Sequence, residues 1–201
     1  MLRDADEIRE ALASAGWTVS SLREKALILE ERVCDVTNVT ARREELRAFI
    51  VVARDCDEGD AVDRFASPAP SPTLAARRVG RTKVFVCVED YARARTELEA
   101  LLPTLEHDTR AWVDTLVARG WRVVRESSLA TVEWDGSWQL LAERLGETLR
   151  VGVISRSGRD EGIRESNGSA FAAVGAYAVF VTVTSAAEAS GLASTLTPGP
   201  T

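Results

Sequence analysis

The clearest indication of the fold is the stretch VGRTKVFVCV, residues 79–88, because the chain carries a near copy of it, VGAYAVFVTV, at residues 174–183. Both stretches fit the pattern V-G-x-x-x-V-F-V-x-V, and 95 residues separate them. Similarity at a fixed spacing indicates an internal repeat. The consecutive apolar residues 84–88 also predict a central strand buried on both faces, because a strand with one exposed face would alternate. The glycines before the two strands, Gly80 and Gly175, favour a bulge or a positive φ.

The repeat extends along the chain. At an offset of 104, IREALASAGWTV at residues 8–19 falls on WVDTLVARGWRV at residues 112–123, and both contain a Gly-Trp pair whose glycine is expected to end a helix. A DEG triplet at residues 57–59 recurs at residues 160–162. The offset shrinks to 95 after SPAPSPTLAARR, residues 67–78, which we predict to be a surface loop that the second copy shortens. The matched segments keep the same order in both copies, and the second copy lacks residues only in a loop. This pattern predicts a tandem duplication.

Each copy is predicted to have the element order α-β-α-β-β-α. The second helix of this order is expected to run through Phe49 in the first copy and to end at Gly146 in the second. The residues expected to cap the helix N-termini are Asp4 and Asp108 for the first helix, Thr40 and Ser137 for the second, and Asp90 and Ser185 for the last. The predicted fold class is therefore α+β, with residues 1–105 and 106–201 as two repeats packed as a pseudo-twofold-symmetric single-chain dimer, and residues 197–201 as a frayed tail.

Composition limits the classes of function. The chain has 201 residues, a net charge of −6 and no basic tail, which argues against a dedicated nucleic-acid-binding protein. It has no run of 18 apolar residues, and its first 20 residues contain four acidic side chains where a signal peptide would be basic and then apolar. The three cysteines lack paired spacing and fit reduced thiols. We therefore expect an acidic, soluble, cytoplasmic protein without membrane contact, and the use of two lysines among 25 basic residues suggests a bacterial origin.

No constellation of catalytic or metal-binding residues stands out in the sequence. His107 is the single histidine and is expected to lie in the connector between the copies, which removes Ser-His-Asp and Cys-His catalysis elsewhere. The acidic segment at residues 55–63 departs from a calcium-binding loop, because Gly59 comes one position early and Ala66 stands where the loop requires Glu. We predict that this segment is an acidic turn. No zinc-ligand spacing and no glycine-rich phosphate loop is present, so we expect no enzyme activity, no cofactor and no metal.

Two groups of residues are the predicted contacts with a partner. Arg77, Arg78 and Arg81 belong, with Lys83, to a local basic cluster that the second copy lacks; the alternative is a solvated strand edge guarded by charge. Trp134 and Trp138 flank a predicted DG turn, have no aromatic counterparts in the first copy, and belong to the residue type most frequent among interface hot spots. The alternative for this pair is packing across the seam between the copies. Because a partner need not respect the internal symmetry, we expect its contacts where the copies differ.

The favoured function is a non-catalytic cytosolic protein-binding module of the antidote (immunity), adaptor or chaperone type. The alternative is a small-molecule-sensing domain with its ligand in the cleft between the two copies, a frequent position for pockets. An enzyme of an unrecognised type is the remaining alternative. The predicted core is shared by several duplicated ligand-sensing and chaperone-like folds, and topology by itself does not assign a function.

Overall fold

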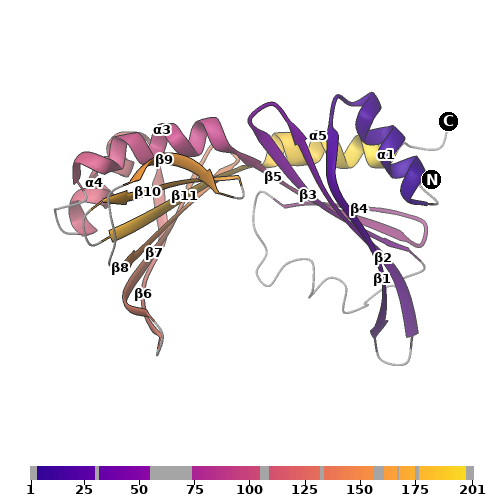
Figure 1. Ribbon diagram of the computed structural model, residues 1–201, viewed down its shortest axis with the longest axis horizontal. Helices are drawn as coiled ribbons and strands as arrows, with labels where there is room; N and C mark the ends of the chain where they lie inside the picture. Colours follow the sequence, from indigo (N-terminus) through magenta and orange to yellow (C-terminus); the bar gives the residue numbers. More distant parts are fainter. Residues whose placement is uncertain are drawn as a thin grey trace. The chain divides into compact units, whose positions relative to one another are not determined.

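The computed structural model of the protein shows a mixed α+β fold (Figure 1). It describes residues 4–29, 32–54, 74–104, 109–131, 134–155, 161–166, 168–174 and 177–197. These residues form four α-helices and a large antiparallel sheet of 11 strands, which confirms the α+β class. None of the helices in these ranges has the length and the apolar character needed to cross a membrane.

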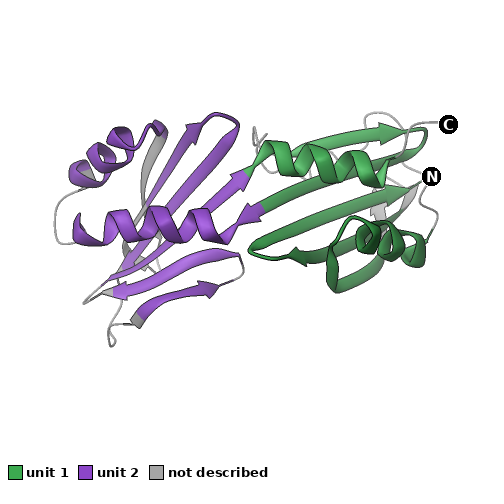
Figure 2. Cartoon of the chain, turned by 90° about the horizontal axis from the view of Figure 1, so that it is seen from above, with its two compact units in different colours: residues 1–88, 185–201 green, residues 89–184 purple. Residues whose placement is uncertain are grey.

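The chain forms two compact units, shown in different colours in Figure 2. Unit 1 contains Met1–Val88 and Ser185–Thr201, and unit 2 contains Glu89–Thr184. The last helix therefore completes the unit in which the chain begins. The predicted repeats, residues 1–105 and 106–201, follow similarity in sequence rather than contact in space, and they stay a prediction.

Unit 1 packs two helices against one face of its strands. Its elements are α1 (Ala5–Ser14), β1 (Thr18–Leu29), β2 (Arg32–Arg43), β3 (Leu46–Arg54), β4 (Ala75–Val79), β5 (Thr82–Asp90) and α5 (Ala186–Leu196). The strand order is β1-β2-β3-β5-β4. The core lies between the helices and this face, and its largest side chains include Ile8, Leu12, Trp17, Ile50, Val84, Val86, Leu192 and Leu196.

Unit 2 also packs two helices against its strands. Its elements are α3 (Tyr91–Leu101), the 3-10 turn η1 (Leu102–Thr104), α4 (Thr109–Ala118), β6 (Arg122–Thr131), β7 (Trp134–Arg144), β8 (Glu147–Ser155), β9 (Glu161–Ser166), β10 (Ser169–Val174) and β11 (Tyr177–Ser185). The strand order is β6-β7-β8-β11-β10-β9. The core side chains include Leu98, Leu101, Trp112, Leu116, Trp121, Leu140, Leu149 and Val181.

The strand at residues 84–88 is buried on both faces, as predicted. Val84, Phe85 and Val86 are 0%, 7% and 0% exposed, although neighbouring residues of a strand point to opposite faces. Gly80 has a φ of 61° in the turn between β4 and β5, which confirms the predicted positive φ. Gly175 lies outside the described residues.

Three predicted helix caps are confirmed. The capping contacts are Asp4 with the N–H groups of Asp6 and Glu7 in α1, Asp90 with that of Arg93 in α3, and Ser185 with that of Glu188 in α5. The first N–H groups of a helix have no partner within the helix, so a side-chain cap contributes about 1 kcal/mol. Asp108 lies outside the described residues.

The predicted second helix of each copy is wrong, because this part of the chain forms β-hairpins. Thr40 lies in β2 and pairs with Phe49 of β3. Ser137 lies in β7, and Gly146, with a φ of 78°, belongs to the β7–β8 turn rather than to a helix end. Alternate side chains along β3 enter the core, which is the period of a strand. The element order α-β-α-β-β-α therefore does not hold.

Two turn and loop predictions also need correction. The predicted loop at residues 67–78 ends in β4, which begins at Ala75, while residues 67–73 lie outside the described ranges. The DG pair between Trp134 and Trp138 lies within β7 rather than in a turn, because Trp134 already pairs with Thr131 of the preceding strand.

Exchanging two glycines for alanine tests the backbone conformation of α5 and of the turn after α1. Gly191→Ala in α5 should raise the free energy of unfolding by about 0.5–1 kcal/mol, because a Cβ there meets nothing within 4 Å and alanine is the better helix former. Gly16→Ala is the matched control: Gly16 has a φ of 78°, so the same exchange should cost about 1 kcal/mol. Urea titrations followed by circular dichroism measure the free energy of unfolding of both variants. Changes of the same sign would contradict the helical conformation at Gly191 or the positive φ at Gly16.

Candidate functional site

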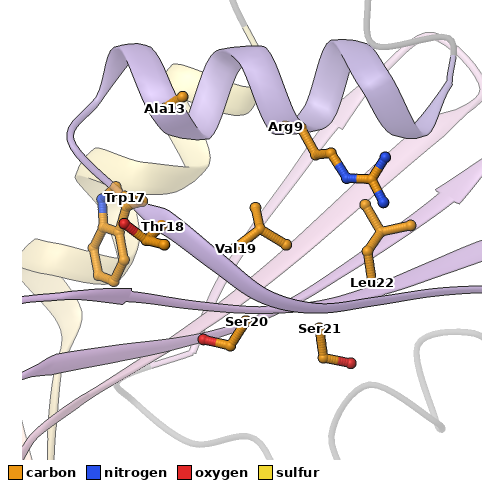
Figure 3. A pocket seen from close by; sticks show the side chains of 8 residues that line it. All are labelled: Arg9, Ala13, Trp17, Thr18, Val19, Ser20, Ser21 and Leu22. Atoms are coloured by element: carbon orange, nitrogen blue, oxygen red, sulfur yellow. The ribbon is translucent and has the colours of Figure 1, made fainter.

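A groove runs between α1 and β1 in unit 1 (Figure 3). Gly16 ends the helix with a positive φ, and the N–H of Trp17 donates to the C=O of Leu12 at 2.9 Å. This turn reverses the chain, so β1 runs back beside the helix that precedes it. The groove has a volume of about 440 Å³. Its lining residues are Arg9, Ala13, Trp17, Thr18, Val19, Ser20, Ser21 and Leu22.

The floor of this groove is apolar. In Figure 3, Val19 and Leu22 point toward α1, whereas Ser20 and Ser21 point away from it. Val19 and Leu22 are half-buried and pack against the core of unit 1. Arg9 extends from α1 over the same space and is the charged residue of the lining. The groove can therefore take apolar side chains beside one cation.

The strand that forms the groove is an outer strand. Among the strands that the structure describes, β1 pairs with β2 alone. Its register shifts between Val19 and Ser21, which leaves Ser20 as an extra residue in the strand. The far side of an outer strand presents N–H and C=O groups to which an extended segment can bond. Arg23 and Lys25, both exposed, lie farther along β1 and are the kind of charges that protect such an edge from pairing with further copies.

An arginine stacked on a tryptophan holds the end of the groove in place. The Arg43 guanidinium lies 4.8 Å from the centre of the Trp17 ring, and its Nη2 lies 2.7 Å from Oε2 of Glu188 on α5. A Cβ at Gly16 would lie in ordinary van der Waals contact with Cδ of Arg43, at 3.7 Å, so the positive φ rather than lack of space favours glycine here. We call this arrangement the Trp-Arg corner. Its ion pair is partly exposed and contributes less than about 1 kcal/mol.

Unit 2 contains a second Trp-Arg corner. Gly120 has a φ of 83°, and the N–H of Trp121 donates to the C=O of Leu116 at 3.0 Å. The Arg144 guanidinium lies 4.2 Å from the centre of the Trp121 ring, and its Nη1 donates to the C=O of Arg119 at 2.9 Å. The same turn and the same stacked pair therefore occur in both units.

The corner of unit 2 is part of a larger cluster of charges around Glu97 of α3. The Glu97 side chain is 3% exposed and bonds Nε of Arg119 at 2.6 Å and Nη2 of Arg144 at 3.5 Å. Glu147 bonds Arg93 at 2.9 Å and Arg144 at 3.3 Å. A buried carboxylate is stable only with such partners, because burial removes its hydration. The hydrogen bond that Arg119 donates to Glu97 raises the pKa of Arg119, so this guanidinium stays charged.

A groove of about 370 Å³ opens beside these charges. Its lining residues are Ala92, Arg93, Thr96, Glu97, Arg119 and Arg144. In contrast to the groove of unit 1, most of this lining is charged, so its chemistry suits an ionic ligand rather than apolar side chains.

The predicted partner contacts lie in different units. Arg77 and Arg78 are in β4, where Arg77 donates to Oγ of Ser194 at 2.7 Å and Arg78 to the C=O of Gly80 at 2.9 Å. Arg81 is in the turn between β4 and β5. Part of this basic cluster therefore attaches β4 to α5.

The predicted tryptophan contacts belong to β7 of unit 2. Trp134 pairs with Thr131 along the backbone, and Trp138 pairs with Ser128 and Val153. The side chains of both tryptophans lie outside the described residues. Their role as partner contacts stays a prediction.

Sequence reasoning identified the two Gly-Trp turns and missed Arg43 and Arg144. Both arginines end a strand just before a tight turn, and each comes more than 20 residues after its tryptophan. A helix was predicted in this region, and a helix would not return these arginines to the tryptophans. The hairpin does so: alternate side chains of β3 enter the core, which a helix would not allow.

Several sequence predictions fall outside the described residues, namely those for His107 and for the acidic segment at residues 55–63. Within the described ranges, no three His, Cys, Asp or Glu side chains are grouped to hold a metal ion. No protein-family model and no curated protein matches this sequence.

The charge cluster around Glu97 yields a stability prediction. Glu97→Gln should lower the free energy of unfolding by about 2–3 kcal/mol, because it leaves two arginines facing a neutral group in a buried position. Glu99→Gln on the same helix is the control, because Glu99 is half exposed and pairs with Arg95 across one helical turn, so its loss should cost about 0.5 kcal/mol or less. Chemical denaturation measures both, and equal losses would contradict a special role for Glu97.

Proposed function

We propose that the chain is a tandem duplication of one α+β unit packed as a single-chain pseudo-dimer. The hairpins β1–β2 and β6–β7 support this, because their registers shift at positions 104 residues apart, after Val19 and after Val123. The two Trp-Arg corners support it as well. In addition, α3 is the last helix of the first repeat in sequence but belongs to unit 2, and α5 is the last helix of the second repeat but belongs to unit 1. Dimers that exchange their C-terminal helices have this arrangement.

We propose further that the protein is a non-catalytic cytosolic protein-binding module of the antidote, adaptor or chaperone type. The observation that carries this proposal is the groove beside the outer strand β1. An extended segment of a partner can add to such a strand: main-chain hydrogen bonds supply affinity, and alternate side chains entering the groove supply specificity. Apolar side chains of the segment would contact Val19 and Leu22, and an acidic side chain would face Arg9.

Trp134 and Trp138 are the second proposed contact, together with Arg77, Arg78 and Arg81. Both groups differ between the two copies of the sequence, whereas the residues that fold each unit, such as the Gly-Trp pairs, are retained. A heterologous partner has no need to follow the internal repeat. Aromatic anchors contribute most to affinity at interfaces, and charges at the rim mainly steer the partner to its site.

Filling the groove tests the proposed function. Ala13→Arg places a long side chain in the groove at an exposed helix position, so it should reduce capture of a partner at least tenfold. Ala187→Arg, at an exposed position of α5 outside the groove, is the matched control and should have no effect. The measurement is recovery of partner proteins by the tagged full-length chain from native cell extract, quantified by mass spectrometry. Recovery of a stoichiometric small molecule without any protein would contradict the proposal and favour the small-molecule sensor.

Replacing both tryptophans tests the second contact. Trp134→Ala with Trp138→Ala should abolish capture and leave the thermal unfolding midpoint nearly unchanged, because loss of an interface tryptophan typically costs about 2 kcal/mol or more of binding energy. Trp112→Ala is the comparison: this ring is 5% exposed and its Nε1 donates to the C=O of Thr104 at 2.6 Å, so its loss should lower the midpoint. If the double variant unfolds like Trp112→Ala, the two rings are core residues and the assignment is wrong.

A further inference from the structure

More charged side chains form ion pairs around α3 in unit 2 than around α5 in unit 1. One arginine and one glutamate, Arg43 and Glu188, join α5 to its sheet. Three arginines and two glutamates surround α3. At the offsets of the repeat, Arg119 falls on Ala15 and Arg93 falls on Glu188. Neither arginine therefore has a basic counterpart in unit 1, and attachment of a helix does not by itself explain them.

The network beside the groove of unit 2 carries one surplus positive charge. Glu97 and Glu147 neutralise two of its three guanidinium groups. The Asp90 carboxylate caps the start of α3, where it accepts from the N–H of Arg93 at 3.0 Å, so its charge is set against the positive end of this helix. Glu143, the remaining carboxylate of the β7 end, pairs with a different arginine at 2.7 Å. A surplus cation in a partly buried groove attracts anions more strongly than one in open water.

We propose that this groove binds the phosphate group of a small molecule. Arg119 bonds Glu97 through Nε, so its two Nη groups can donate to a ligand in the groove. Arg93 is 52% exposed and can turn toward the same space. Guanidinium groups bind phosphate with two parallel hydrogen bonds. The volume of about 370 Å³ leaves room for the rest of a phosphorylated small molecule. This proposal does not depend on the proposed protein-binding function.

Titration of the full-length protein with inorganic phosphate at constant ionic strength tests this site. Isothermal titration calorimetry should show one bound phosphate, and Arg93→Gln should weaken its binding about tenfold through the loss of a charge-assisted hydrogen bond. Arg95→Gln is the matched control, because Arg95 is on the same helix and pairs with Glu99 outside the groove, so its loss should change nothing. Acetate at the same ionic strength should bind more weakly than phosphate, and tighter binding of acetate would overturn the choice of phosphate.

A second variant predicts a gain in affinity. Glu147→Gln removes the carboxylate that competes for Arg93 and Arg144, so phosphate should bind several-fold more tightly. Thermal unfolding without phosphate checks that both variants remain folded. A network that serves only to attach α3 would give no phosphate binding in the unmodified protein and no gain in Glu147→Gln. Either result, or equal losses in Arg93→Gln and Arg95→Gln, would overturn the proposal.

Discussion

One interaction joins the elements in both units, namely the arginine that stacks on the tryptophan following α1 or α4. Trp17 is fixed by the turn at Gly16, Arg43 comes from the end of β2, and Glu188 comes from α5. The corner therefore joins a helix, a hairpin and a second helix, and its ionic partners are 145 residues apart in the sequence. Lysine could not replace the arginine, because the interaction needs a planar cation that covers the ring and still donates sideways. Without the corner, Trp17, which lines the groove, would lose the guanidinium that covers its ring.

The sequence predicts the parts of this fold that depend on neighbouring residues. The caps at Asp4 and Asp90, the positive φ at Gly80 and the doubly buried strand at residues 84–88 all follow from local chemistry, and the structure confirms them. The predicted second helix failed because a cap residue such as Thr40 is equally suited to a strand, where its branched side chain packs well. The site was harder to predict, because Arg144 acts only through a hairpin and a helix that meet in three dimensions.

The two units share an architecture and differ in the chemistry of their surfaces. The groove of unit 1 combines a main-chain edge with half-buried valine and leucine side chains, which favours recognition of an extended polypeptide. The groove of unit 2 is lined by guanidinium groups around a carboxylate that is 3% exposed, which favours recognition of charge. Under the proposed duplication, the residues that both copies share would have kept the scaffold, while residues such as Arg119 diverged in one copy. The proposed duplication would account for the features that both cores share, and under that proposal the differences between the copies are where function would have been added.

Because α5 belongs to unit 1, the two units are completed in a particular order during translation. Unit 2 is one continuous segment, Glu89–Thr184, whereas unit 1 is assembled from both ends of the polypeptide. Translation proceeds from the N-terminus, so every residue of unit 2 is available before the ribosome has made α5. Until Leu192 and Leu196 emerge, part of the apolar sheet face of unit 1 lacks its cover. The unit that begins first is thus finished last, and a nascent chain that stalls before its final helix would present this apolar face to chaperones and proteases.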